Sequence, residues 1–234
     1  MEYCSRSVSG QTEPIHPGLS ETVSKHLKHP YQRPVQPYNR DAFHRVFDYW
    51  QSQRCPPLIL DSGCGTGFSA HQLAEQHQDH LVVGIDQSLH RLSKGGAGKH
   101  GADSGWLSRG NLCLVRADLV DCWRLAAAES LPVAKHFILY PNPWPKKKHL
   151  LRRWHGHPVF PDLIRISTTL ELRSNWKTYV DEFALALAVP GISETVLQGP
   201  MPFLPGPDTF LTPFEKKYAL SGQPLYRLRA FGPK

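Results

Sequence analysis

The sequence lacks any long hydrophobic run. Its longest apolar stretch, FALALAV at residues 183–189, is far shorter than the roughly 20 residues that a transmembrane helix requires. The first residues, MEYCSRSVSG, contain no apolar core of the kind found in secretory signal peptides. We therefore expect a protein that does not span a membrane, is not exported and works in the cytoplasm.

Cysteine is scarce, and its spacing excludes the usual frameworks. The chain has an odd number of cysteines and no C-x-x-C pair; they are Cys4, Cys55, Cys64, Cys113 and Cys122. Neither a disulfide scaffold nor a zinc ribbon fits this pattern, so we expect reduced thiols. The remaining metal-directed pattern is His-Gly-His at residues 155–157, which is isolated in a basic segment. We therefore predict no metal site.

Acidic residues are outnumbered by basic ones. The chain has 20 Asp and Glu against 27 Lys and Arg, which gives a net charge of +7 and a pI near 9.2. An excess of positive charge favours an anionic partner such as nucleic acid, although many basic proteins bind none. The clustering of the charge therefore matters more than its sum, and the densest cluster begins at Lys146.

Apolar segments alternate with helical patterns along most of the chain. A helix is expected from Tyr38, with Phe43, Val46, Phe47 and Trp50 on one face. Buried strands are expected at residues 57–61, 80–86, 112–118, 136–140, 168–175 and 224–231, and further helices at 68–76, 121–130 and 176–187. Such alternation is typical of a mostly parallel sheet with helices on both faces. We predict a Rossmann-like α/β domain over residues 38–234.

Two proline-rich segments interrupt this pattern. Residues 1–37 are polar and contain five prolines, so we expect an extended N-terminal arm. Residues 199–213 contain five more, and we expect a long loop there.

A glycine-rich loop, DSGCGTG at residues 61–67, follows the first expected strand. Gly63, Gly65 and Gly67 allow the backbone to turn tightly and to approach a ligand closely. Asp61 precedes the loop, while Asp86 and Asp118 end the next two strands, where carboxylates can accept ribose hydroxyls and an adenine amino group. Three carboxylates would repel a pyrophosphate, so they favour an adenosyl ligand without phosphates.

NAD is the rival ligand for this loop. GTGFSA, from Gly65, fits the dinucleotide pattern G-x-G-x-x-A, so the glycines alone do not exclude it. Asp61 favours S-adenosylmethionine instead, because that cofactor carries an ammonium and a sulfonium. A glycine turn without a ligand is the third reading.

A second feature lies at the end of a later strand. The segment YPNPWPKKKH, residues 140–149, places a rigid aromatic turn before a run of cations. At the carboxyl end of the sheet these cations would hold RNA phosphates; they are Lys146, Lys147, Lys148, Arg152 and Arg153, together with His149. The aromatic rings of Trp144 and Trp154 flank the run and suit contact with nucleic acid. The alternative is a solvated helix face.

Taken together, these motifs resemble a known family. LDSGCGTG with VVGID is similar to the class I methyltransferases, and YPNPWPKKKH resembles the signature of the tRNA (guanine-N7)-methyltransferases, usually Pro-Asp-Pro-Trp followed by basic residues. RSNWKTY at 173–179 and TPFEKKYALSGQPLYRL at 212–228 resemble two further elements of that family in the same order. The resemblance covers most of the chain from Asp61 onward.

The resemblance implies a role for each matching residue. The S-adenosylmethionine site would comprise Asp61, Gly63, Gly65, Gly67, Asp86, Asp118 and Asn142. Asn142 also stands at the position of the family's catalytic Asp. The tRNA substrate would be bound by Trp144, Lys146, Asn175, Thr212 and Glu215, with Glu215 offering a carboxylate to the guanine edge. We expect a monomer or a weak homo-oligomer.

The chain departs from the family at two positions, because Asn142 and Asn175 replace carboxylates. Guanine N7 already carries an in-plane lone pair, so its methylation needs no general base. An amide can accept a hydrogen bond but brings no charge, and charge-assisted hydrogen bonds are about twice as strong. We therefore predict a slower or differently tuned enzyme rather than an inactive one.

Two alternatives remain open on the sequence. Asn-Pro-Trp resembles the Asn-Pro-Pro-aromatic turn with which amino-methyltransferases hold an exocyclic amine, and Trp144 would then stack on a base. The chain could also be a non-catalytic RNA-binding relative in which both amides mark lost chemistry.

Overall fold

The computed structural model describes residues 13–100, 103–192, 196–206 and 209–232, and these form two compact units. We call residues 33–138 with 166–168 the glycine-loop unit, and residues 13–32, 139–165 and 169–232 the NPWP unit, after the turn Asn142–Pro145. Within the described ranges, no helix is both long and apolar enough to cross a membrane.

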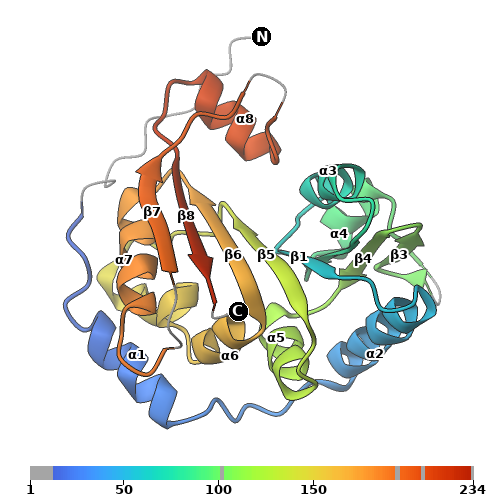
Figure 1. Ribbon diagram of the computed structural model, residues 1–234, viewed down its shortest axis with the longest axis horizontal. Coiled ribbons are helices and arrows are strands. Elements are labelled where there is room, and N and C mark those ends of the chain that lie inside the picture. The colour runs from blue at the N-terminus through green and yellow to red at the C-terminus, as the bar shows by residue number, and fades with distance from the viewer. Residues whose placement is uncertain (1–12, 101–102, 193–195, 207–208, 233–234) are drawn as a thin grey trace. The chain divides into compact units, whose positions relative to one another are not determined.

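The glycine-loop unit is built on a mostly parallel sheet (Figure 1). Its strands, in spatial order, are β3 (Trp106–Arg109), β4 (Leu112–Arg116), β2 (Leu81–Asp86), β1 (Leu58–Ser62) and β5 (Val133–Leu139). β4, β2, β1 and β5 pair in parallel, and β3 forms an antiparallel hairpin with β4. Because β1 and β2 are buried on both faces, they read as continuous apolar runs in the sequence.

Helices cover both faces of this sheet. α3 (Phe68–Gln76) and α4 (Leu89–Leu92), followed by the 3-10 turn η1 (Ser93–Gly95), lie on the face to which Gly84 and Leu114 point. α2 (Pro37–Ser52) and α5 (Leu119–Ala128) lie on the other face, against Val83, Ile85 and Val115. The opposite facing of Gly84 and Val83 follows from the two-residue period of a strand.

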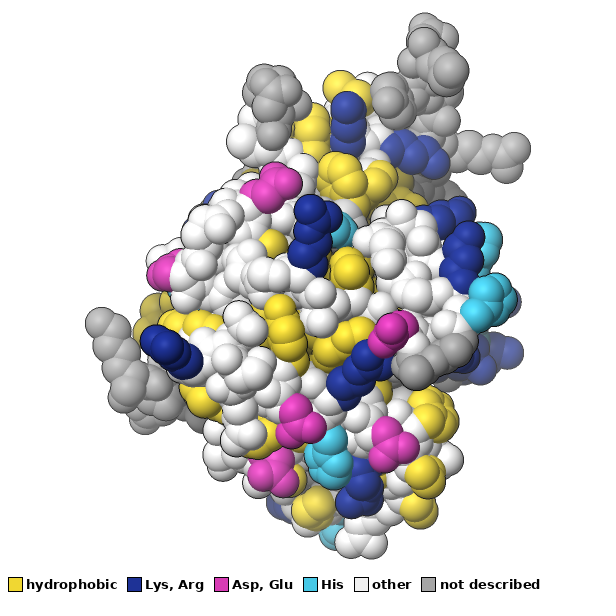
Figure 2. Space-filling model, turned by 90° about the vertical axis from the view of Figure 1, so that its right-hand side faces the viewer, with side chains coloured by type: hydrophobic (Ala, Val, Ile, Leu, Met, Phe, Trp, Pro, Cys, Tyr) yellow, Lys and Arg dark blue, Asp and Glu magenta, His cyan; other side chains and the backbone are white. Residues whose placement is uncertain are grey.

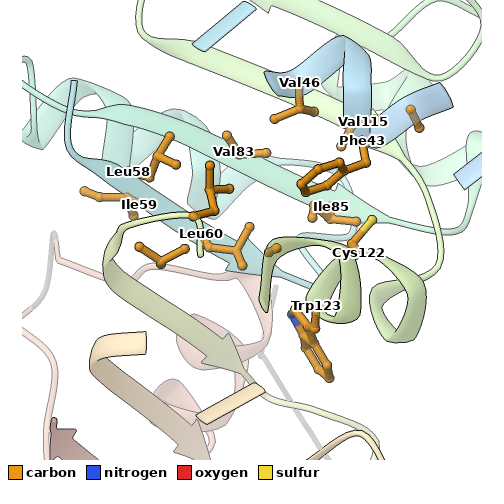
Figure 3. A pocket seen from close by; sticks show the side chains of 14 residues that line it. Phe43, Val46, Leu58, Ile59, Leu60, Val83, Ile85, Val115, Cys122 and Trp123 are labelled. Carbon is orange, nitrogen blue, oxygen red and sulfur yellow. The ribbon is translucent and has the colours of Figure 1, made fainter. Parts of the chain in front are cut away.

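The core under α2 and α5 encloses a small apolar cavity of about 30 Å³ (Figure 3). Phe43 and Val46 of α2, Ile85 of the sheet and Cys122 of α5 line it, as Figure 3 shows. Its walls offer almost no polar atom, so it is a packing defect of the core and not a binding site for a polar cofactor.

The NPWP unit carries an antiparallel sheet. Its strands, in spatial order, are β6 (Ser167–Ser174, from Thr169 onward in this unit), β8 (Tyr226–Phe231) and β7 (Val196–Pro202). α7 (Lys177–Leu187) packs against β7 and β8, and α1 (Leu19–Lys28) packs against α7 and α6 (Phe160–Arg165) (Figure 1). Two 3-10 turns, η3 (Lys147–Arg152) and η4 (Trp154–Gly156), and α8 (Pro213–Leu220) complete this unit.

Most predicted elements are confirmed, whereas the conformation of two proline-rich segments was predicted wrongly in part. In the N-terminal arm, residues 19–28 form the helix α1 instead of an extended chain, and Leu19 and Val23 are buried on it. The prolines lie outside this helix, and its apolar residues follow a four-residue spacing that the proline count obscured. The predicted loop at 199–213 begins inside β7, which tolerates prolines because it is the edge strand of this sheet. The domain boundary at residue 38 stays a prediction.

Candidate cofactor and nucleic-acid sites

The glycine loop adopts a backbone that its glycines make possible. Gly63, Gly65 and Gly67 have φ angles of 80°, 61° and 77°, in the left-handed region that side chains disfavour. A Cβ on Gly67 would lie 2.8 Å from Leu114 Cδ1, so that glycine is also required for packing α3 onto the sheet. A Cβ on Gly65 would meet nothing within 4 Å, so the loop presents open backbone at that residue.

Asp61 lies at the base of this loop on β1, and its side chain is buried. Its Oδ2 accepts a hydrogen bond of 2.5 Å from the Ser69 hydroxyl. Within the described part of the chain no cation pairs with it. Burial, together with the nearby Asp86 carboxylate, raises the pKa of Asp61 to about 7. A buried carboxyl group without a counter-charge is costly to ionise, and a cationic ligand would relieve that cost.

Asp86 ends β2 and shapes the glycine loop directly. Its Oδ2 accepts the backbone N–H of Gly65 at 3.0 Å, and its Oδ1 accepts that of Ser88 at 2.8 Å. The Arg91 guanidinium lies 3.3 Å from Oδ1. Asp86 is 4% exposed, so its carboxylate is a rigid feature of the loop.

Asp118 follows β4 and caps α5. Its Oδ1 accepts the Val120 backbone N–H at 2.8 Å, which is the N-cap arrangement that aspartate favours. Its Oδ2 lies 3.3 Å from Nη2 of Arg33, which also donates to Asp121 at 2.8 Å. Arg33 lies in the predicted N-terminal arm, and the structure shows it paired with these two carboxylates.

The NPWP turn follows β5 in the other unit. The exposed Asn142 uses its Oδ1 to accept the Trp144 backbone N–H at 3.3 Å. Trp144 has a φ of 45°, which is unusual for a large side chain. Such a conformation costs roughly 1–3 kcal/mol, so contacts with surrounding residues must offset this cost. The Arg152 guanidinium lies over the Trp144 ring, 4.7 Å from its centroid, and His149 meets the ring edge-on.

The basic run divides into exposed and buried members. Lys146, Lys147, Lys148 and Arg152 are exposed, as binding to phosphates requires. Arg153 was predicted to bind RNA as well, but its side chain is 7% exposed and pairs with Glu182. Its interior position explains the difference, because the run ends where η3 returns to the core at Leu150.

The downstream substrate candidates are buried. Asn175 is 5% exposed, and its Nδ2 donates to Gln223 Oε1 at 3.1 Å. Thr212 caps α8 by accepting the Glu215 backbone N–H at 3.0 Å, so part of the Thr-x-x-Glu pattern is a helix start.

Glu215 is fully buried and already occupied. Arg173 Nη1 lies 2.9 and 3.1 Å from its two carboxylate oxygens. Burial raises the pKa of Glu215, and Arg173 offsets only part of this effect. As the chain stands, this carboxylate is not open to a guanine edge, contrary to the sequence-based expectation.

The predicted site residues thus fall into two groups, each assembled within its own unit. Asp61, the three glycines, Asp86 and Asp118 come together in the glycine-loop unit. The NPWP unit holds Asn142, Trp144, Lys146, Asn175, Thr212 and Glu215. Sequence reasoning missed the juxtaposition of His77, Asp79 and His80, whose side-chain ligand atoms lie within 4.8 Å of one another in a surface turn.

Figure 2 shows a face of the molecule on which Lys and Arg side chains lie among acidic, histidine and hydrophobic ones, so the positive charge on this face is dispersed.

The cysteines of the described ranges, Cys55, Cys64, Cys113 and Cys122, are free thiols, whereas Cys4 lies outside those ranges.

Comparison with solved structures defines the class of fold. The chain resembles the 16S rRNA methyltransferase KamB, with a TM-score of 0.52 and 17% identity, covering 81% of this chain and 94% of that one. It also resembles the 16S rRNA (adenine(1408)-N(1))-methyltransferase from Catenulisporales acidiphilia, with a TM-score of 0.50 and 15% identity, covering 87% and 96%. The predicted Rossmann-like methyltransferase fold is therefore confirmed.

Sequence comparison gives the family. Residues 56–228 match the model of the family described as "Putative methyltransferase", and the chain belongs to this methyltransferase family. Curated relatives named tRNA (guanine-N(7)-)-methyltransferase occur in Leifsonia xyli subsp. xyli, at 28% identity over 75% of this chain and 76% of the relative, and in Acidithiobacillus ferrooxidans, at 27% over 80% of each. A third, in Halorhodospira halophila, is 27% identical over 75% of this chain and 77% of the relative. The resemblance found in the motifs is confirmed, and the role of each site residue stays a prediction.

Proposed function

We propose that this protein is an S-adenosylmethionine-dependent methyltransferase that acts on N7 of a guanine in tRNA. The relatives named for this activity support the substrate. The observation that carries the cofactor is Asp61, a buried carboxyl group without a counter-ion, beneath an open glycine backbone. As a tRNA-modifying enzyme it would act in the cytoplasm, as a monomer or weak homo-oligomer.

The glycine-loop unit would hold the cofactor. Asp61 would take up its positive charge, Asp86 would accept the ribose hydroxyls with the lone pairs that the loop leaves over, and Asp118 would receive the adenine amino group. Gly63, Gly65 and Gly67 would let the backbone approach closely. The carboxylates fit this ligand better than NAD, whose pyrophosphate would meet repulsion from Asp61 and Asp86.

The NPWP unit would hold the substrate. The exposed lysines, with Lys146 closest to the turn, would neutralise RNA phosphates, and Trp144 would stack on a base. Asn142 would accept a hydrogen bond from the guanine, and its assignment to the cofactor site stays a prediction. Asn175 and Thr212 would border the substrate, whereas Glu215 could reach it only after the start of α8 moves.

The chemistry asks little of the protein beyond alignment. When bound, the cofactor supplies a sulfonium methyl group, which the N7 lone pair takes as the electrons of the S–CH₃ bond return to sulfur. N7 carries no proton, so no side chain must act as a base. Alignment of this kind can lower the activation free energy by roughly 7–11 kcal/mol. Asn142 can assist it by orientation, without the charge that a carboxylate would bring.

The test is methyl transfer from isotopically labelled S-adenosylmethionine into unmodified tRNA, followed by nucleoside digestion and mass spectrometry. We expect labelled 7-methylguanosine. Labelled methyladenosine would instead support an amino-methyltransferase that uses the Asn-Pro-Trp turn. Cofactor binding without any label in RNA would point to a non-catalytic RNA-binding relative, and absence of cofactor binding would reject the proposal.

A further inference from the structure

A second buried carboxylate lies in the NPWP unit, and its surroundings differ from those of Asp61. Glu182 on α7 is fully buried. Its Oε2 pairs with Arg153 Nη1 and lies 2.9 Å from His155 Nε2. Its Oε1 accepts the backbone N–H of His16 at 2.9 Å. Both oxygens are therefore engaged by groups of the protein itself.

The partner of this carboxylate, Arg153, connects it to the NPWP turn. Arg153 Nε donates to the Trp144 carbonyl at 3.2 Å, and Nη2 donates to the Pro145 carbonyl at 3.2 Å. One guanidinium thus bridges a helix carboxylate and two successive carbonyls of the turn. The fork of an Arg side chain suits such a bridge, and a Lys could not reproduce it.

The two carbonyls belong to the part of the turn that most needs support. Trp144 has a left-handed φ of 45°, a conformation that persists in large residues only when the surroundings fix it. The turn has no carboxylate of its own, because Asn142 offers an amide. Among the described residues, the turn's own side chains hold its backbone through one hydrogen bond, of 3.3 Å from the Trp144 N–H to Asn142 Oδ1. From outside the turn, Arg153 holds its backbone with two hydrogen bonds, while Arg152 and His149 contact the Trp144 ring.

We propose that Arg153 and Glu182 are positioning residues for methyl transfer: the buried pair fixes the NPWP turn and thereby orients Asn142 and Trp144. This inference rests on the proposed function for its catalytic consequence. Its structural consequence, a fixed turn, is independent of the reaction. Neither residue touches the reacting atoms, and both act through the turn.

The chain offers a matched control. Asp181, the neighbour of Glu182 on α7, pairs with Lys177 at 2.6 Å on the outside of the helix. Asp181→Asn removes a carboxylate charge from the same helix without touching Arg153. Glu182→Gln keeps the shape and a hydrogen-bond acceptor but removes the charge that Arg153 requires. Arg153→Lys keeps the charge and loses the fork.

The experiment combines turn conformation with the rate of chemistry in the full-length protein. Each variant is labelled with 5-fluorotryptophan, and the Trp144 fluorine resonance is assigned with Trp144→Phe. We expect Glu182→Gln and Arg153→Lys to shift or broaden this resonance, while those of Trp50 and Trp123 in the other unit stay in place. At saturating tRNA and cofactor, the single-turnover rate should fall about 100-fold, with cofactor affinity within about twofold of the parent protein. Asp181→Asn should change none of these quantities.

Three results would overturn the proposal. The first is an unmoved Trp144 resonance in both variants. The second is a displaced turn with an unchanged single-turnover rate, and the third is an equal effect of Asp181→Asn. If Glu182→Gln does not fold, Arg153→Lys decides alone. If the parent protein methylates no tRNA, the proposed function fails, whereas the fluorine resonance still decides whether the pair fixes the turn.

Discussion

Two fully buried carboxyl groups, one in each unit, have opposite electrostatics. Asp61 has a hydroxyl partner but no cation among the described residues, and burial raises its pKa to about 7. Burial alone would raise the pKa of Glu182 too, but hydrogen bonds from His155, Arg153 and the backbone N–H of His16 lower it to about 2. The same chemical group thus serves two purposes.

This difference in ion pairing distinguishes a carboxyl group that can bind a ligand from one that stabilises the fold. A buried acid without a counter-charge lowers the stability of the folded protein when it ionises. Binding of a cationic ligand would offset this cost, so such a group is a candidate for ligand binding. A buried acid with a complete set of donors is part of the architecture, because removing either partner leaves an isolated charge. Substitutions at four residues, from the largest expected effect to the smallest, test this interpretation.

The largest effect is expected from breaking the paired acid. Glu182→Ala would leave Arg153 buried without a counter-charge, which typically costs about 3–5 kcal/mol of unfolding free energy. Urea denaturation at neutral pH measures it. A loss of unfolding free energy below roughly 1 kcal/mol, the range of an exposed ion pair, would show that Glu182 contributes little to the stability of the fold.

The unpaired acid should behave in the opposite way. The folded-state pKa of Asp61 lies above its ordinary value of 3.8, so this group favours folding at low pH and opposes it as the pH rises toward 7. Asp61→Asn should therefore raise the unfolding free energy at pH 8 by roughly 1–3 kcal/mol and weaken S-adenosylmethionine binding about 30–100-fold. Calorimetry and denaturation check both changes, with the exposed Asp41→Asn as the control. Loss of stability with intact binding would contradict the assignment.

The pH dependence of stability provides a second comparison between Glu182 and Asp61. Its folded pKa of about 2 lies below the ordinary value of 4.5, so its stabilisation is present above pH 4.5 and is lost as the pH falls toward 2. In curves of unfolding free energy against pH, the slope between pH 4.5 and 2 should therefore be shallower in Glu182→Gln than in the parent protein, while the slope between pH 4 and 7 should be shallower in Asp61→Asn.

A smaller effect is expected at the turn. Asn142→Asp would add a charge-assisted contact to the guanine, and we expect the single-turnover rate to rise about tenfold. Quenched-flow methyl transfer at saturating tRNA measures it. An equal or lower rate would show that the amide is adapted to this active site.

The smallest effect concerns the basic run. Lys146→Ala should weaken tRNA binding about threefold and reduce the slope of log affinity against log salt by about 1. Filter binding at several salt concentrations measures both, with the exposed Lys25→Ala of α1 as the control. An unchanged affinity would remove Lys146 from the phosphate-binding residues.

The sequence predicted those features that rest on local pattern. The glycine loop, the strand ending at Asp86 and the helix at 68–76 were found because period and glycine spacing are local signals. The helix α1 was missed because flanking prolines outweighed its four-residue apolar spacing. The strand β3 was missed because it is short and half-exposed.

The candidate site was less predictable, because partners across the fold decide what a side chain does. Arg153 reads as one more cation of the basic run, and only the distant Glu182 turns it into a buried bridge. Glu215 reads as an available carboxylate, and only Arg173 on β6 shows that it is occupied. In the same way, Asp61 is available to a cationic ligand because no Lys or Arg of the described residues pairs with it, and the sequence alone does not show this.

The most direct test of this contrast is calorimetric titration with S-adenosylmethionine between about pH 5.5 and 7.5, in two buffers of different ionisation enthalpy. We expect the affinity to rise as the pH approaches 7, with proton release at the acid end, and both effects to vanish in Asp61→Asn. A pH-independent affinity without proton release in the parent protein would contradict the claim that Asp61 is held in readiness for a cationic cofactor.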